Sequence, residues 1–188
     1  EPVEPSIPEL TVTGPSAEVA GDAENFEVTF VATHDKELEY LEIDHNLGKH
    51  GSLPSEVDDL PEFKLYPNED NVWSPADMKD ENENGEYNQR AAEAEDWGLS
   101  ATYSVENGTH TWVLTFGGDA LEKIRELTAE HTNNQFKIYS LVKDVDGVKS
   151  GSMYDGSYVT TVVTLAEVEE EPVEPSIPEL TVTGPSAE

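Results

Sequence analysis

Residues 99–116 read LSATYSVENGTHTWVLTF, and this stretch predicts two antiparallel strands joined by a tight turn. Asn107-Gly108 separates two runs in which apolar and polar residues alternate, and an Asn-Gly pair in this setting is a strong signal for a β-hairpin. Trp112, Leu114 and Phe116 would share one face of the second strand, because alternate residues of a strand point to the same side. The hairpin therefore predicts a sheet with one buried face.

On either side of this hairpin, five further segments have the two-residue period of half-buried strands. They are residues 10–13, 26–32, 41–47, 136–142 and 158–165. The segment 136–142 is apolar on both faces, so we expect it to be central in its sheet. One helix is expected over Ala120–His131, with Asp119 as its N-cap. Seven strands and one short helix predict an all-β chain, an immunoglobulin-like antiparallel β-sandwich, with a jelly roll as the main alternative.

Residues 1–18, EPVEPSIPELTVTGPSAE, recur without change as residues 171–188, a spacing of 170. This period fits a whole domain better than a solenoid unit of about 20–50 residues. We therefore expect a Pro/Glu-rich linker at 1–9, an immunoglobulin-like repeat domain at 10–170 and the start of the next identical repeat at 171–188. Within the repeat, residues 48–98 are rich in Pro, Asp, Glu and Asn, and we expect a large acidic insertion with short local elements.

The charge balance excludes several classes of partner. The formal net charge is −31, from 41 acidic and 10 basic residues, which makes nucleic acid and anionic lipid poor partners.

No stretch approaches the roughly 20 apolar residues of a membrane span, so no membrane insertion of this segment is expected. The chain has no Cys nucleophile, Gly-x-Ser-x-Gly motif or phosphate-binding Gly loop, so we do not expect an enzyme.

Dense negative charge has two explanations: solubility or salt adaptation through solvated carboxylates, or oxygen-rich Ca²⁺ sites. The best metal candidate is the Asp-x-Asp-Gly turn at Asp144 and Asp146, with Asp155 eleven residues after Asp144. Alternate residues of such a turn can direct two carboxylates toward one ion, and the later Asp could complete the shell. The alternative is an ordinary Asp-Gly turn in a solvated loop.

The expected topology adds a second argument for Ca²⁺. In a seven-strand sandwich, the loop after the second strand and the loop before the last strand lie at the end where the chain enters. Asp35 and Glu37 would thus join Asp144 and Asp146. The preceding repeat would offer Asp22 and Glu24 from its opposite end, and shared Ca²⁺ ions would fix the angle between repeats.

Identical acidic repeats, a Pro/Glu junction, the lack of Cys and a penultimate strand that runs into Lys143-Asp144-Val145-Asp146-Gly147 together suggest a family. In these features the chain resembles the immunoglobulin-like extender repeats of giant bacterial surface adhesins of the RTX type. The resemblance implies an extracellular, Ca²⁺-stiffened stalk at the cell surface, whose partners are neighbouring identical repeats in the same chain or filament. The 48–98 insertion and the helix depart from those shorter repeats.

Two other functions stay open. Trp73 and Trp97 lie in polar sequence and could form a sugar-stacking platform of a carbohydrate-binding repeat, or could anchor the insertion to the core. Alternatively, the chain could be a filament subunit in which residues 8–13 of one copy complete the sheet of its neighbour by strand addition. Trp112 and His45 lie on apolar strand faces and are expected to be core residues.

Overall fold

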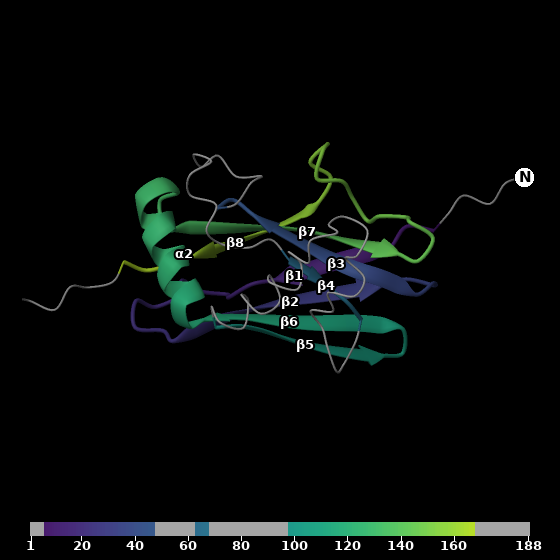
Figure 1. The fold of residues 1–188 in the computed structure, drawn as a ribbon, viewed down its shortest axis with the longest axis horizontal. Helices are drawn as coiled ribbons and strands as arrows, with labels where there is room; N and C mark the ends of the chain where they lie inside the picture. Colours follow the sequence, from purple (N-terminus) through teal and green to yellow (C-terminus); the bar gives the residue numbers. More distant parts are fainter. Residues whose placement is uncertain (1–5, 48–62, 68–97, 168–188) are drawn as a thin grey trace, which may run out of the picture.

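The computed structural model describes residues 6–47, 63–67 and 98–167, and these form two packed antiparallel sheets and one helix (Figure 1). The first sheet has the order β1-β2-β6-β5, made of β1 (Glu9–Thr13), β2 (Asn25–Thr33), β6 (Thr109–Gly117) and β5 (Leu99–Glu106). The second has the order β4-β3-β7-β8, made of β4 (Phe63–Leu65), β3 (Leu38–His45), β7 (Gln135–Asp144) and β8 (Val159–Thr164). The prediction of an all-β sandwich is confirmed.

The strand order is that of an immunoglobulin-like sandwich. With the strands other than β4 lettered A to G in chain order, one sheet reads ABED and the other reads CFG. The added strand β4 pairs with β3 through Leu41↔Leu65 and lies within the expected insertion. The sequence therefore predicted seven strands where the described residues form eight, because a strand of three residues is too short to show a period.

The β5–β6 hairpin forms as expected from its sequence. Glu106 pairs with Thr109, and the two residues between them have positive φ, 51° at Asn107 and 78° at Gly108. Positive φ at both central positions is the geometry of a type I′ turn, whose twist matches that of the strands it joins. Trp112, Leu114 and Phe116 on β6 are all fully or almost fully buried, so the predicted inward face is confirmed.

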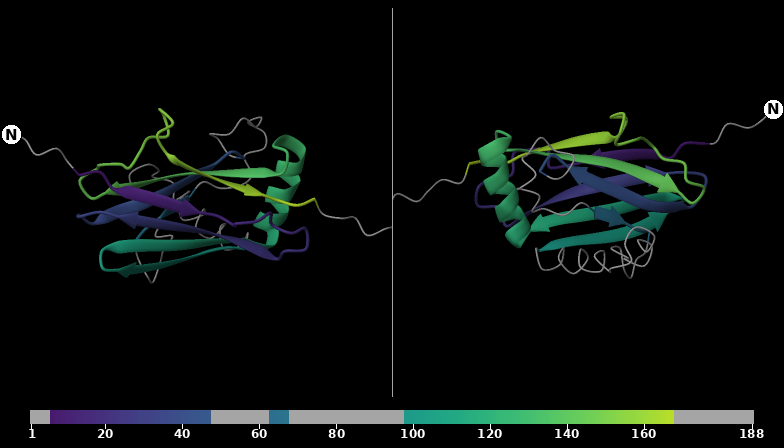
Figure 2. Two further views of the ribbon diagram at one scale, coloured as in Figure 1. Left: turned by 180° about the vertical axis from the view of Figure 1, so that it is seen from behind. Right: turned by 45° about the horizontal axis from the view of Figure 1, so that its top comes forward.

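Helix α2 (Gly118–His131) lies across one end of the sandwich, between β6 and β7 (Figures 1 and 2). Its apolar residues Leu121, Ile124 and Leu127 are buried. The expected N-cap was wrong: Asp119 is in the first turn, and Gly117 is the N-cap with no side-chain hydrogen bond. The chain passes directly from the last residue of β6 into the helix, so the cap falls on a strand residue.

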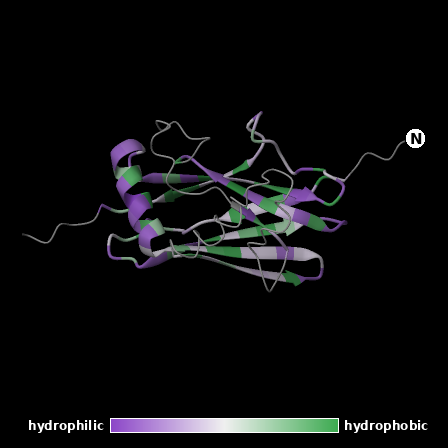
Figure 3. Ribbon diagram, viewed as in Figure 1, coloured by the Kyte–Doolittle hydropathy of each residue, from purple (hydrophilic) through white to green (hydrophobic). Residues whose placement is uncertain are grey.

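The core lies between the sheets and is largely aromatic near α2. Phe26 stacks on Phe116 with ring centroids 4.8 Å apart, and Phe136 meets Phe116 edge-on at 5.5 Å. The alternation of hydrophobic and hydrophilic residues along the strands is visible in Figure 3. Strand β7, which carries Phe136, is internal to its sheet as expected, and both Trp112 and His45 are buried core residues.

The two ends of the sandwich differ in what closes them. We call the end where β1 begins the N-terminal pole; it holds the turn at 34–37 and the turn at 144–148. The opposite end, the C-terminal pole, holds the loop at 14–24, α2 and the end of β8. The assignment follows from the pairs Glu9↔Thr33 and Leu38↔Asp144 at one end and Asn25↔Gly117 and Gln135↔Thr164 at the other.

Candidate functional site

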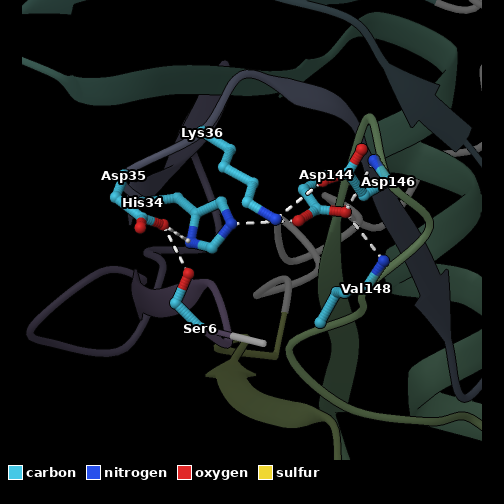
Figure 4. A network of polar contacts seen from close by, with 7 residues as sticks. All are labelled: Ser6, His34, Asp35, Lys36, Asp144, Asp146 and Val148. Carbon is cyan, nitrogen blue, oxygen red and sulfur yellow. Dashed lines mark hydrogen bonds and ion pairs between the residues drawn. The ribbon is translucent and has the colours of Figure 1, made fainter. Parts of the chain in front are cut away.

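One inward-facing row of side chains from each sheet ends in a polar residue at the N-terminal pole. On β2 the row passes through the fully buried Phe30 and Ala32, and the same period leads to His34 just beyond the strand. On β7 the row passes through Val142 and ends at Asp144. His34 Nε2 lies 3.0 Å from Asp144 Oδ2, so this pair joins the two sheets where the apolar core stops (Figure 4).

The carboxylate of Asp144 is fully buried, and both of its oxygens accept hydrogen bonds. Its Oδ1 accepts hydrogen bonds from the backbone N–H of Asp146 at 3.0 Å and of Val148 at 2.7 Å. Burial by itself raises the pKa of Asp144, but the Val148 amide, the His34 ring and the Asp146 amide outweigh it, so the pKa is lowered overall. Asp144 is therefore ionised at neutral pH, and Nε2 of His34 is the donor to Oδ2.

Three further contacts surround this pair. Lys36 Nζ lies 2.6 Å from Asp146 Oδ2, and this hydrogen bond is the main reason that the pKa of Lys36 is raised. Asp35 accepts a hydrogen bond from the Ser6 hydroxyl, which is the main reason that the pKa of Asp35 is lowered. His34 Nδ1 lies 3.3 Å from Asp35 Oδ1.

We call this set the N-pole network: Ser6, His34, Asp35, Lys36, Asp144, Asp146 and the amide of Val148. It joins three segments that are far apart in the sequence, namely the incoming chain at residue 6, the turn at 34–37 and the turn at 144–148. A backbone hydrogen bond from Val145 N–H to the Glu37 carbonyl, 3.1 Å long, adds a second link between the two turns. The network thus fastens the start of the domain to both sheets.

The expected gathering of acids at this pole is found, but its chemistry differs from that of a Ca²⁺ site. Asp35, Asp144 and Asp146 do lie near one another, with the side chains of His34 and Lys36 between them. Ca²⁺ takes about 6–8 oxygen ligands, whereas these carboxylates already accept hydrogen bonds from protein donors. Within residues 6–47, 63–67 and 98–167, no three His, Cys, Asp or Glu side chains form a group that could hold a metal ion. A Ca²⁺ site at this pole therefore stays a prediction.

Two candidate acids lie outside the network. Glu37 is exposed and contributes its backbone carbonyl. Asp155 lies in a separate turn, where its Oδ1 accepts hydrogen bonds from the backbone N–H and the hydroxyl of Ser157, at 2.9 and 2.6 Å. The Ser157 hydroxyl is the main cause of the lowered pKa of Asp155. The structure therefore places Asp155 in a turn of its own, with local partners.

The remaining candidates lie elsewhere. Asp22 and Glu24 are exposed at the C-terminal pole, on the loop between β1 and β2, which is the opposite end from Asp35 and Glu37 as the topology predicts. Trp73 and Trp97 lie outside the described residues, so the carbohydrate-binding hypothesis stays a prediction. Most of the linker at 1–9, most of the 48–98 insertion and all of 171–188 lie outside them as well.

The C-terminal pole holds a second fastening, which the sequence did not reveal. From α2, Arg125 donates to the Ala20 carbonyl at 2.6 Å through Nη2 and to the Ala166 carbonyl at 3.3 Å through Nη1. Val19 forms a parallel bridge with Leu165 beside it. One guanidinium therefore holds both the loop at 14–24 and the segment by which the chain leaves the domain.

The importance of His34 could have been inferred from the sequence, and that of Arg125 could not. The alternation of Phe30 and Ala32 continues in phase to His34, and that of Ile138 and Val142 continues to Asp144, so two polar residues extend buried rows. No comparable pattern marks Arg125, because its two acceptors are backbone carbonyls of distant segments.

The fold and its two fastened poles define an all-β sandwich domain through which the chain runs from one end to the other. No protein-family model matches the chain, and no curated protein matches it. Among solved structures, a DUF4466 family protein from Parabacteroides merdae is similar with a TM-score of 0.34 and 9% identity, over 86% of this chain and 44% of that protein. A likeness this weak carries no argument. In the described part of the chain, no helix has the length and apolar character needed to cross a bilayer.

Proposed function

We propose that this chain is a structural extender, one repeat of a stalk that holds another domain away from a cell surface. The observation that supports this most directly is the position of the two chain ends in the described domain. β1 begins at one pole and β8 ends at the other, beside α2 (Figures 1 and 2). Domains connected in this way extend along a line, whereas domains with adjacent termini fold back on themselves.

The segments by which the described chain enters and leaves the domain are also held by contacts with it. At the N-terminal pole, Pro8 is buried and Ser6 binds Asp35. At the C-terminal pole, Arg125 and Val19 hold the segment that ends at Ala166. Fixed exit directions turn each repeat into a stiff segment, so that bending is confined to the linker between them. This is the property a stalk needs.

The expected length of one repeat can be worked out from these positions. Strand β7 has ten residues and spans about 33 Å, which sets the length of the sandwich. Between residue 167 and the next copy of Ser6, at Ser176, eight residues of Pro/Glu-rich sequence would add roughly 28 Å as an extended polyproline-like segment. A repeat would therefore advance the chain by roughly 60 Å.

Small-angle X-ray scattering of chains with one, two and three copies of residues 1–170 tests the proposal. We expect the maximum dimension to rise by roughly 60 Å for each added copy, nearly in proportion to copy number. A rise that levels off after the second copy would show that the repeats collapse onto one another, and the extender function would be wrong.

Ca²⁺ stiffening stays a separate prediction, which the N-pole network does not support. A Ca²⁺ bridge from Asp22 and Glu24 of one repeat to Asp35 and Glu37 of the next would require the poles to touch, whereas an extended linker keeps them apart. The same scattering series with Ca²⁺ and with EDTA separates the two arrangements. A rise of only about 35 Å per copy in Ca²⁺, returning to roughly 60 Å in EDTA, would identify the bridged form.

A further inference from the structure

Strand β1 occupies an edge of the first sheet and is held by a short, regular set of contacts. Its five residues pair antiparallel with β2 from Glu9↔Thr33 to Thr13↔Thr29. Leu10 and Val12 are half-buried and pack against the main core, while Glu9, Thr11 and Thr13 are exposed. The place that β1 fills on β2 is therefore a defined slot with two apolar positions.

The chain carries a second copy of the strand that fills this slot. Residues 179–183 read ELTVT, identical to residues 9–13, and the identity extends over the whole of 171–188. Leu180 and Val182 stand where Leu10 and Val12 stand in the first copy. Residues 179–183 could make every contact that β1 makes with β2 and the core, because the two segments have the same amino-acid sequence.

We propose that the β1 position on β2 is a docking site for residues 179–183 of a second copy of this chain. The second copy would replace β1, with the register in which β1 now pairs, instead of adding a strand at a free edge. The proposal depends on the described pairing of β1 and on the sequence identity, and it does not require the extender function.

The positions of the poles favour a donor from another chain. The described chain ends at the C-terminal pole, but residue 179 would have to lie opposite Thr33 at the N-terminal pole. Within one chain, the twelve residues 168–179 would have to cover about 33 Å along the domain and also pass around α2, which leaves almost no slack. Between chains, the donor's C-terminal pole faces the acceptor's N-terminal pole without strain.

The exchanged contact is heterologous, so it leads to open chains of molecules, head to tail. The population of the exchanged form is set by competition between residues 179–183 of another molecule and β1. β1 makes the same contacts but is tethered, because it belongs to the same chain as β2. A short tether gives an effective concentration on the order of 1 mM. Exchange should thus involve about 1% of molecules at 10 μM and become comparable to the unexchanged form near 1 mM, as in crowded arrays of neighbouring chains.

Weakening β1 alone makes the exchange measurable in the full chain. The double variant Leu10→Asp/Val12→Asp removes the apolar contacts of β1, and the matched double variant Leu180→Asp/Val182→Asp removes those of residues 179–183. The quadruple variant carries all four substitutions. Size-exclusion chromatography with light scattering and thermal unfolding would be measured at 5 μM and 200 μM, concentrations chosen to differ by about 40-fold for the mass-action test.

We expect the first double variant to form dimers and longer oligomers at 200 μM and to melt several degrees higher there than at 5 μM. The second should remain monomeric and melt as the wild type does at both concentrations. The quadruple variant should melt at the same lower temperature at both. If the first double variant behaves like the quadruple one, whether poorly folded or merely monomeric, the proposal is wrong.

A disulfide reports the register directly, since the chain has no native Cys. Thr11 pairs with Val31, so Thr181 should do so after exchange. In the Leu10→Asp/Val12→Asp background, Val31→Cys with Thr181→Cys should give disulfide-linked oligomers at least five times more abundant than Val31→Cys with Ser186→Cys, which has a comparable tether. Equal yields, or cross-linked monomers alone, would overturn the proposal.

Discussion

Replacement of Asp144 by alanine should be among the most destabilising changes outside the apolar core. The substitution removes the acceptor of the Asp146 amide, the Val148 amide and the His34 ring at once. A buried donor left without an acceptor costs about 1–3 kcal/mol. Since Asp146 is exposed and Val148 is half-buried, water can reach both amides, and the low end of this range applies to them.

The expected loss for Asp144→Ala is therefore about 3 kcal/mol in the free energy of unfolding. In a chain of this size, that corresponds to a fall in Tm of roughly 6–12 °C. Asp144→Asn keeps an oxygen for the two amides and loses the charge, so we expect about 1 kcal/mol. Asp155→Ala is the matched control: its carboxylate also accepts an amide and a side-chain donor, but it is exposed, and we expect a stability close to that of the wild type.

Urea unfolding followed by far-UV circular dichroism at pH 7 would measure these differences, and repeating it at lower pH tests the charge. Because the pKa of Asp144 is lowered in the folded state, its contribution is complete above about pH 4 and is lost as the pH falls through the lowered pKa. The gap between wild type and Asp144→Asn should shrink as the pH falls below about 4, because protonation then removes the charge of Asp144 in the wild type as well. An Asp144→Ala variant within 1 kcal/mol of wild type, or no less stable than Asp155→Ala, would refute the reasoning.

Three further outcomes are expected. Phe116→Ala should lower the free energy of unfolding by about 3–5 kcal/mol in the same urea assay, because it removes a ring stacked within the core. Arg125→Met should speed hydrogen exchange of the Val19 and Ala166 amides at least fivefold over wild type, with Arg125→Lys intermediate; unchanged exchange would show that the guanidinium holds neither segment. Burial lowers the pKa of His110, so the wild type should lose stability relative to His110→Phe as the pH falls below about 6.5, and a constant difference between pH 7.5 and 5 would contradict this.

The sheets could be predicted because their signals are local. The Asn107-Gly108 turn and the alternation around Trp112 need no knowledge of distant residues, and both appear in the structure as expected. Strand β4 could not be predicted, since Phe63–Leu65 is a strand through its pairing with β3 and not through a pattern of its own. The N-cap at Gly117 was missed for a related reason, because the strand and the helix share that residue.

The candidate site could be placed from the sequence but its chemistry could not. The immunoglobulin-like topology brought Asp35 and Asp144 to one pole, as expected. The partners of these acids are side chains from distant parts of the sequence, and only the three-dimensional structure shows which ones they are. Lys36 reaches Asp146 across 110 residues, and His34 reaches Asp144 across the same separation. A list of carboxylates suggested an ion, and the packing places protein donors on the same side chains. Ca²⁺ binding itself stays a prediction.

The placement of β1 and β8 has a mechanical consequence. Tension applied to the two chain ends would act along the strand axes, because β1 starts at one pole and β8 finishes at the other. Hydrogen bonds between strands are perpendicular to that direction, so the ladder of β1 on β2 would be loaded in shear, and its bonds would have to rupture together instead of one at a time. The force that a domain withstands in this geometry is set by its rate of unfolding, so tensile strength would not require a covalent cross-link.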